Sequence, residues 1–313
     1  MMTSREMRSR ETLLQRRQLA QDRTIRKVRV HRSQSGRDME RGNTIMEDWG
    51  RLAGNITKAG VPKMDAISNI RHAPYPVSPF PVNACIPTIG RGTVTKVIDV
   101  LLTSTATNLN IFVVVQDNDP IAERLRTQYG DKKNVFVESI ATKIGWVAAQ
   151  NLIAQQPGAL FMLGDDAVVT CDTVRTLEIA MVTVFPAGDG IVVPLETQTL
   201  WGVGPMPGFG FVGSFPFVGD NFLNRFPDRQ ILCPDYFAHS SDVELLDYGL
   251  SVNRYVQCAE AKLDHFVFRP EDHDPTAMII KSLAIRAIEI YVERNRKGYL
   301  WGKNFHRLGE PKG

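Results

Sequence analysis

The sequence lacks the features that mark membrane, secreted and disulfide-stabilised proteins. No apolar run reaches the roughly 20 residues that a membrane helix needs, and the charged N-terminus contains no apolar signal-peptide core. The four cysteines lie far apart and form no Cys-x-x-Cys pair. That spacing favours a reducing compartment over a disulfide framework or a zinc site. We therefore expect a cytoplasmic protein without a membrane span.

Residues 1–43 contain few large apolar side chains, but they are rich in positive charge. They carry 12 Arg or Lys and 5 Asp or Glu, a net charge of +7, so the remaining 270 residues carry about −4 of the total +3. We interpret this segment as a basic arm that is mobile or ordered only by a partner. It could contact the phosphates of nucleic acid, or it could serve only as a solubilising or assembly arm. Residues 44–81 form a Pro-rich lead-in, because four prolines between His72 and Pro81 exclude a helix there.

From Val82 onward, short apolar runs alternate with helical patterns, in a chain whose 43% hydrophobic content is ordinary for a globular protein. This alternation predicts an α/β fold with a mostly parallel twisted sheet and helices on both faces. The predicted strands are Asn83–Pro87, Asn110–Val115, Asn134–Val137, Ala159–Leu163 and Gly190–Pro194. The predicted helices between them follow Thr93, Pro120, Gly145 and Asp172.

Three polar loops follow predicted strands: Thr88–Arg91, Gln116–Asp119 and Gly164–Asp166. Ligands of such sheets bind outside the carboxyl ends of the strands. The adjacent carboxylates of Asp165 and Asp166 repel each other, and a divalent cation with a phosphate ligand would offset that repulsion. The alternative is a solvated turn, since Asp is a common turn residue. The convergence of three polar loops favours the metal site.

The second half of the chain offers three further candidate residues. Residues 202–219 contain six glycines, four phenylalanines and no charge, which predicts a loop packed by aromatic side chains. Trp201 before it is a candidate surface on which a sugar or base could stack. Asp242 stands at the start of a helix as a catalytic base or as an N-cap. His265 ends a predicted strand and could be a metal ligand or a structural histidine.

The order of these segments resembles the inverting family-two glycosyltransferases of the GT-A fold, over about Val82 to His265. The resemblance rests on five segments: IPTIGRGT, VVVQDND, KIGWVAAQNLIAQQPGALFMLGDDAVV, SSDVELLDYG and LDHF. In that family the metal motif is usually Asp-x-Asp. Here Asp166 falls on the metal ligand, and Gly164 replaces the first aspartate. The resemblance therefore leaves two options: Asp165 takes over the ribose contact, or the register shifts by one.

This resemblance implies a role for each matched residue. Asp242 would be the catalytic base, Asp166 and His265 the metal ligands, and Trp201 and Glu244 the acceptor contacts. The implied donor-binding residues are Pro87, Thr88, Arg91, Asp117, Lys143, Gly145 and Asp165. The implied cofactor is Mn²⁺ or Mg²⁺, and the implied donor is a nucleotide sugar, a UDP-sugar above all.

The implied reaction moves a sugar to an acceptor hydroxyl with inversion; a polysaccharide or a modified DNA base could be the acceptor. Two alternatives stay open: a sugar-phosphate nucleotidyltransferase, and a catalytically silent binding protein of the same fold. We divide the chain into the arm (1–43), the lead-in (44–81), a donor-binding half (82–198), an acceptor-binding half with the base (199–275), and a C-terminal helix with a basic tail (276–313).

Overall fold

The computed structural model describes residues 80–106, 108–140, 145–196, 213–238, 240–265 and 277–310. All of these residues belong to one compact unit, Trp49–Gly313. The expected arm and nearly all of the lead-in lie outside the described residues. Within the described ranges, no helix has the length and apolar character required to cross a lipid bilayer.

One half of the central sheet is parallel, as the strand–helix alternation predicts. Strand β1 pairs with β2 on one side and β4 on the other, and β2 pairs with β3, all in parallel. These strands span Val82–Pro87 (β1), Leu109–Gln116 (β2), Val135–Ile140 (β3) and Ala159–Met162 (β4). Each confirms a predicted strand, and the carboxyl ends of all four therefore point the same way.

The other half of the sheet contains antiparallel pairs. The full order is β3-β2-β1-β4-β7-β6-β8-β5. Strand β7 runs antiparallel to both β4 and β6, β8 runs parallel to β6, and β5 is antiparallel to β8. These strands span Ala167–Val168 (β5), Ile191–Glu196 (β6), Phe217–Val218 (β7) and Tyr255–His265 (β8). Part of the glycine- and phenylalanine-rich segment thus supplies a strand as well as a loop.

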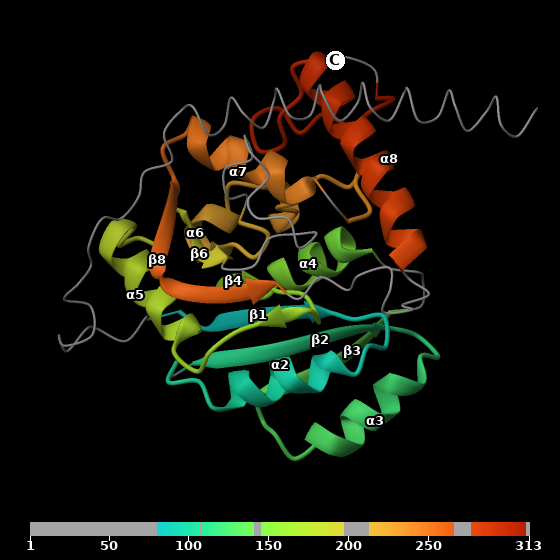
Figure 1. Ribbon diagram of the computed structural model, residues 1–313. Helices are drawn as coiled ribbons and strands as arrows, with labels where there is room; N and C mark the ends of the chain where they lie inside the picture. Colours follow the sequence, from blue (N-terminus) through green and yellow to red (C-terminus); the bar gives the residue numbers. More distant parts are fainter. Residues whose placement is uncertain are drawn as a thin grey trace, which may run out of the picture. The chain divides into compact units, whose positions relative to one another are not determined.

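Helices cover both faces of the sheet (Figure 1). Buried residues of α2 (Thr93–Leu102), α3 (Pro120–Tyr129) and α5 (Thr173–Val184) join one hydrophobic cluster. Buried residues of α4 (Trp146–Ala154), α6 (Asp220–Leu223), α7 (Ser241–Ser251) and α8 (Ala277–Arg296) join a second cluster. A short 3-10 helix, η2, spans Pro227–Arg229. The expected layering, a sheet between two helical layers, is confirmed.

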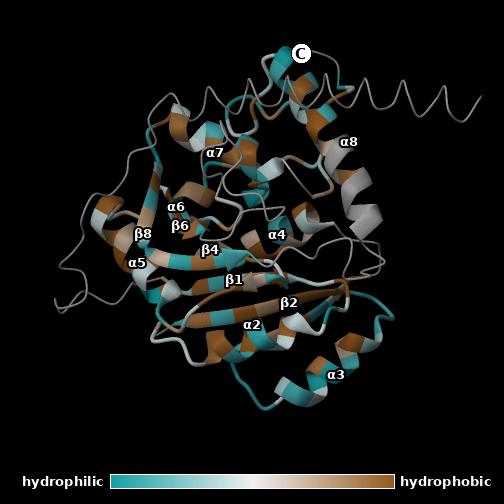
Figure 2. Cartoon of the chain, viewed as in Figure 1, coloured by the Kyte–Doolittle hydropathy of each residue, from teal (hydrophilic) through white to brown (hydrophobic). Residues whose placement is uncertain are grey.

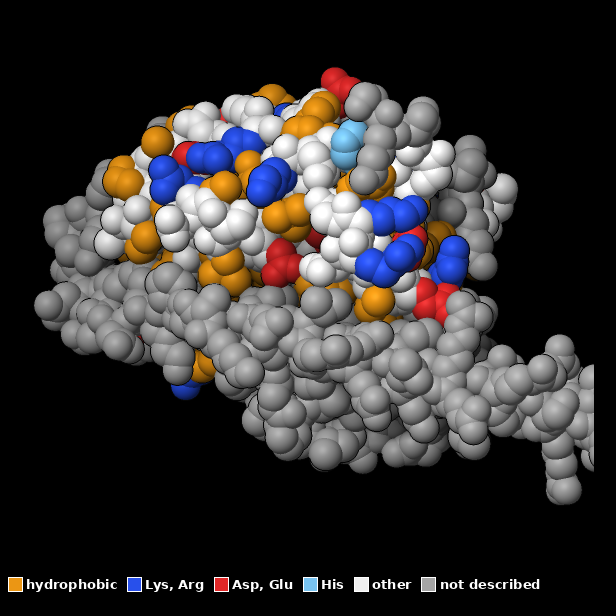
Figure 3. Space-filling model, turned by 90° about the horizontal axis from the view of Figure 1, so that it is seen from above, with side chains coloured by type: hydrophobic (Ala, Val, Ile, Leu, Met, Phe, Trp, Pro, Cys, Tyr) orange, Lys and Arg blue, Asp and Glu red, His pale blue; other side chains and the backbone are white. Residues whose placement is uncertain are grey.

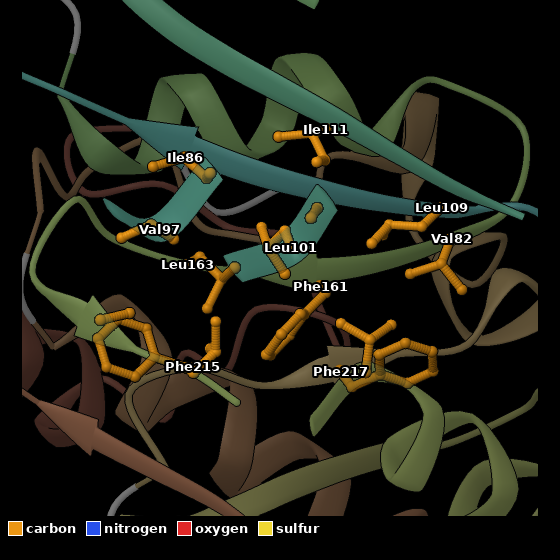
Figure 4. Packing of buried hydrophobic residues seen from close by; sticks show 14 of the residues in the cluster. Val82, Ile86, Val97, Leu101, Leu109, Ile111, Phe161, Leu163, Phe215 and Phe217 are labelled. Carbon is orange, nitrogen blue, oxygen red and sulfur yellow. The ribbon is translucent and has the colours of Figure 1, made fainter. Parts of the chain in front are cut away.

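Alternating side chains of the central strands divide between the two clusters. In β1, Ala84 and Ile86 face the first cluster and Cys85 the second. Figure 4 shows the first cluster, with Phe161 of β4 and Leu101 of α2 on the same side of the sheet. Because both faces are buried, β2 is apolar along most of its length, which Figure 2 shows as mostly hydrophobic colouring.

Two helix starts follow from local chemistry. Pro120 is the first residue of α3, and the Asp119 carboxylate before it accepts a hydrogen bond from the Ile121 N–H at 3.0 Å. Helix α4 begins after Gly145, where a side chain would clash with the carbonyl oxygen of Phe237. That carbonyl accepts a hydrogen bond from the Val147 N–H at 3.3 Å. The close backbone contact explains why a glycine stands at position 145.

Candidate active site

The three polar loops meet at one edge of the sheet. In the parallel register Pro87 of β1 lies opposite Val114 of β2, and Cys85 lies opposite Met162 of β4. The strands therefore end close together and their loops share one side. A Cβ atom added to Gly90 would lie 3.3 Å from a carboxylate oxygen of Asp119, so the first and second loops are in contact.

Asp165 fastens the first loop to the end of β4. One of its carboxylate oxygens accepts a hydrogen bond from the Thr88 hydroxyl at 2.7 Å, and the other forms an ion pair with the Arg91 guanidinium at 3.0 Å. The residue is only 4% exposed. Burial raises the pKa of Asp165, although the charge of Arg91 opposes that shift. Both carboxylate oxygens are thus used to position Thr88 and Arg91.

The glycine that replaces the first aspartate of the Asp-x-Asp motif has a steric explanation. A Cβ atom at Gly164 would clash with Oδ1 of Asp166 and would lie 3.4 Å from the Phe215 ring. A side chain at position 164 would therefore require the Asp166 carboxylate to turn from this orientation. The Asp165 carboxylate, in turn, contacts Thr88 and Arg91 of the first loop.

Asp166 and His265 are brought together by the pairing of β5 with β8. Ala167, directly after Asp166, lies opposite His265 in that antiparallel ladder. As a result, the Asp166 Oδ2 atom is 3.5 Å from Nε2 of His265 and 3.7 Å from the Arg91 guanidinium. Burial alone would raise the pKa of Asp166, but His265 and Arg91 lower it overall. Burial alone would lower the pKa of His265, but Asp166 and other nearby carboxylates raise it.

Glu196 is a member of this site that the sequence analysis missed. It ends β6, is 8% exposed, and accepts hydrogen bonds from both the backbone N–H and the hydroxyl of Ser214. Its Oε2 atom lies 3.9 Å from Nδ1 of His265. Burial raises the pKa of Glu196 to about 7, against the opposing effects of His265 and Ser214. The sequence does contain a signal for Glu196, because this carboxylate comes at the end of an apolar run, as Asp165 and Asp166 do.

Asp242 is the second residue of α7, and its side chain is half-buried. The N-cap position belongs to Ser240, which has a left-handed backbone with φ 65°. Burial raises the pKa of Asp242 to about 6, while nearby backbone N–H groups act to lower it. The charge of Asp242 in turn influences the pKa values of His265 and Glu196. The Asp242 carboxylate is therefore electrostatically coupled to the Asp166–His265 pair.

The chemistry of this pair fits a divalent cation. A carboxylate oxygen and an imidazole nitrogen 3.5 Å apart can both approach one ion, and both are ligand types for Mn²⁺. In the described part of the chain, no group of three or more His, Cys, Asp or Glu side chains is arranged to hold a metal. A cation here would need further oxygen ligands from a bound molecule, as Mg²⁺ has when it binds substrate phosphates.

The structure gives less information on the roles of the remaining predicted donor and acceptor residues. Lys143 and Trp201 lie outside the described residues. Pro87 ends β1 and Asp117 lies half-buried in the second loop, where its N–H donates to the Ile140 carbonyl at 2.8 Å. Gly145 is packed against the Phe237 backbone. Their roles in donor binding stay predictions.

Glu244 lies in the interior and not on an acceptor surface. It is 2% exposed, and its carboxylate accepts hydrogen bonds from the Arg294 guanidinium at 2.8 and 2.9 Å, from the Tyr236 hydroxyl at 2.6 Å and from the Trp301 N–H. Arg294 also pairs with Asp235 at 2.7 Å. These bonds join α7, α8 and the segment after α8. We therefore leave Glu244 out of the site.

Removing Arg294 should destabilise the protein strongly, because Glu244 would keep its buried charge without a cationic partner. We expect Arg294→Met to lower the free energy of unfolding by about 3–5 kcal/mol, measured by urea denaturation. The double substitution Arg294→Met with Glu244→Gln removes both charges but keeps an acceptor oxygen for the Tyr236 and Trp301 donors, so it should recover a large part of that loss. If the single variant is as stable as the wild type, the network contributes nothing to folding.

Solved structures resemble the fold of this chain, although comparisons of its sequence with families and curated proteins find no match. No protein-family profile matches the chain, and no curated protein matches it in sequence. A structure of glucosyl-3-phosphoglycerate synthase from Mycobacterium tuberculosis with Mn²⁺, UDP and glucosyl-3-phosphoglycerate aligns with a TM-score of 0.51 at 15% identity. A second structure of that enzyme, with UDP, aligns with a TM-score of 0.51 at 14% identity. Both alignments cover 76% of this chain and 86% of the other.

This chain has the GT-A fold. A mannosyltransferase from Pyrobaculum calidifontis in complex with GDP-mannose and Mn²⁺ also aligns, with a TM-score of 0.48 at 12% identity over 80% of each chain. In this GT-A fold, the described site comprises the loops that follow β1, β2 and β4, together with the ends of β6 and β8 and the start of α7. The fold expected from the sequence is confirmed.

Proposed function

We propose that this chain is an inverting glycosyltransferase that moves a sugar from a nucleotide-sugar donor to an acceptor hydroxyl with the help of a divalent metal. The observation that carries the proposal is the Asp166–His265 pair, set beside Arg91 and coupled to the half-buried Asp242. The structural neighbours support it, because the M. tuberculosis enzyme is described with Mn²⁺ and UDP. A UDP-sugar is accordingly the first donor to test.

In this mechanism the first loop binds the diphosphate part of the donor, and the Asp166–His265 pair would hold the metal ion that offsets its charge. Asp165 holds Thr88 and Arg91 in place, so that the guanidinium can face phosphate oxygens. Asp166 and His265 would hold Mn²⁺ or Mg²⁺, which, when bound, supplies positive charge that stabilises the leaving nucleoside diphosphate.

Asp242 is the proposed general base. Its carboxylate takes the proton of the acceptor hydroxyl as the hydroxyl oxygen forms a bond to the anomeric carbon. The bond from that carbon to the diphosphate breaks, and the electron pair leaves with the diphosphate. A pKa of about 6 leaves Asp242 mostly ionised at neutral pH, and a pKa near neutrality suits a general base. A single displacement without an enzyme nucleophile inverts the anomeric centre.

The acceptor is proposed at the level of a hydroxyl compound, either a polysaccharide or a modified DNA base. On the face drawn in Figure 3, described Lys and Arg side chains stand among hydrophobic, uncharged and acidic ones. The described part of this face shows no continuous basic patch. For a nucleic-acid acceptor, the candidate phosphate contacts are the basic residues 1–43, which lie outside the described residues.

A donor-hydrolysis screen tests the proposed function. Full-length protein is incubated with UDP- and GDP-sugars, with Mn²⁺ or with a chelator, and the released products are identified. We expect metal-dependent release of a nucleoside diphosphate from at least one donor. Release of pyrophosphate from a nucleoside triphosphate and a sugar phosphate would identify a nucleotidyltransferase instead. Binding of UDP without turnover of any donor would favour the catalytically silent alternative.

A further inference from the structure

A hydrogen bond closes the short loop that leads the chain into α7 and contains Asp242. The hydroxyl of Tyr236 donates to Oε2 of Glu244 at 2.6 Å, although the two residues are eight positions apart. Both residues are buried. Asp242 lies between them in the chain, so this bond ties together the two ends of the segment that carries the proposed base. We call residues 236–244 the base loop.

Three further contacts fix the shape of the base loop. The Ser241 hydroxyl donates to the Ala238 carbonyl at 2.8 Å. Between them, Ser240 takes the left-handed backbone conformation, with φ 65°, and so turns the chain into the helix. On its other side the loop is attached to α4, because the Phe237 carbonyl accepts a hydrogen bond from the Val147 N–H at 3.3 Å. The loop therefore has a defined place against the first turn of α4.

The first turn of α4 also contacts the donor side of the site. The indole N–H of Trp146, the residue before Val147, donates to the Leu163 carbonyl at 3.3 Å. Leu163 directly precedes the loop Gly164–Asp166. One helical turn thus contacts both the base loop and the strand end that carries the two adjacent aspartates.

Glu244 is a fixed point for the end of the base loop. The Arg294 guanidinium and the Trp301 N–H also donate to its carboxylate, and these bonds do not involve Tyr236. Loss of the Tyr236 hydroxyl would therefore leave the Glu244 charge paired. Removing that hydroxyl should open the loop without unfolding the protein.

We propose that Tyr236 is a positioning residue for Asp242: its bond to Glu244 closes the base loop and so holds the Asp242 carboxylate in place relative to the donor loops. A base acts only within hydrogen-bond reach of the proton that it removes. A displacement of about 1 Å can lower a rate by about 10²-fold. The role of Asp242 as the base rests on the proposed function, whereas closure of the loop does not.

Hydrolysis of UDP-glucose with Mn²⁺ by the full-length protein tests the proposal, because water then replaces the acceptor and Asp242 still takes the proton. We expect Tyr236→Phe to lower kcat about 10–100-fold and to leave UDP affinity unchanged. In the Asp242→Asn background the same substitution should have no further effect on kcat, since the base that Tyr236 positions is already lost. Equal falls in kcat in the two backgrounds would show that Tyr236 acts independently of Asp242 and would overturn the proposal.

Tyr291→Phe is the matched control. Tyr291 is also buried, and its hydroxyl donates at 2.6 Å to another carboxylate of α7, that of Asp247. Because Asp247 lies outside the base loop, this variant should lower the melting temperature as Tyr236→Phe does but keep the wild-type kcat. If the two variants lose kcat to the same extent, the loss comes from reduced stability and not from the position of Asp242.

Amide hydrogen exchange, measured without donor or metal, follows the loop itself. We expect residues 237–243 to exchange about 2–10-fold faster in Tyr236→Phe than in the wild type, as loss of one hydrogen bond predicts. Tyr291→Phe should leave this segment unchanged. Unchanged exchange in Tyr236→Phe would overturn the proposal whatever the rates show. Faster exchange in a protein that hydrolyses no nucleotide sugar would instead refute the proposed function, and with it the role of Tyr236 in the reaction.

Discussion

Asp242→Asn is expected to lower the rate of sugar transfer by about 10²–10⁴-fold while leaving donor affinity unchanged. The amide cannot accept the proton of the acceptor hydroxyl, so the attacking oxygen would have to lose its proton without help. The side chain keeps its size, and the contacts that hold Asp165, Asp166 and His265 do not involve it. Transfer rates and UDP affinity, measured on the same preparation, separate the two effects.

Asp247→Asn is the matched control for this experiment. Asp247 lies in the same helix, and burial raises its pKa to about 6 as well. Its carboxylate, however, accepts a hydrogen bond from the Tyr291 hydroxyl at 2.6 Å and packs α7 against α8. Asp247→Asn should therefore transfer sugar at nearly the wild-type rate. A normal rate in Asp242→Asn would show that Asp242 has only a structural role at the start of α7.

Sequence patterns could predict the donor half of the site because its signals are local. Each apolar run that became β1, β2 or β4 ends where polar residues begin, and parallel strands place those ends together. Asp165 and Asp166 could be singled out in this way from about ten residues of sequence. The sequence did not distinguish the roles of these two residues, because their roles depend on the directions in which the two side chains point.

The rest of the site depends on contacts between distant segments. The β5–β8 ladder joins residues about 100 positions apart, and a two-residue strand such as β5 has no recognisable sequence pattern. Strand β7 comes from a glycine- and aromatic-rich stretch, because pairing with β4 and β6 outweighs weak local preference. Glu244 has an ordinary helical context, and only the approach of Arg294 shows that it is buried.

The second large effect is expected at Asp166. Asp166→Ala should abolish the Mn²⁺-dependent part of UDP binding, because His265 alone would remain as a protein ligand and the diphosphate would lose its link to the chain. Calorimetric titration of UDP, with and without Mn²⁺, measures that part directly. If Asp117 in the second loop binds the nucleoside, as the sequence predicts, that binding should persist at its weak metal-free level.

Asp165→Asn provides the contrast that decides between the two adjacent aspartates. The Asp165 carboxylate binds Thr88 and Arg91, so its loss should release the first loop and weaken UDP binding both with and without Mn²⁺. Asp166→Ala should instead affect only the measurement with metal. Both variants should keep their fold, which thermal melting checks. If Asp165→Asn alone removes the effect of Mn²⁺, Asp165 is the metal ligand and the assignment of the two residues must be reversed.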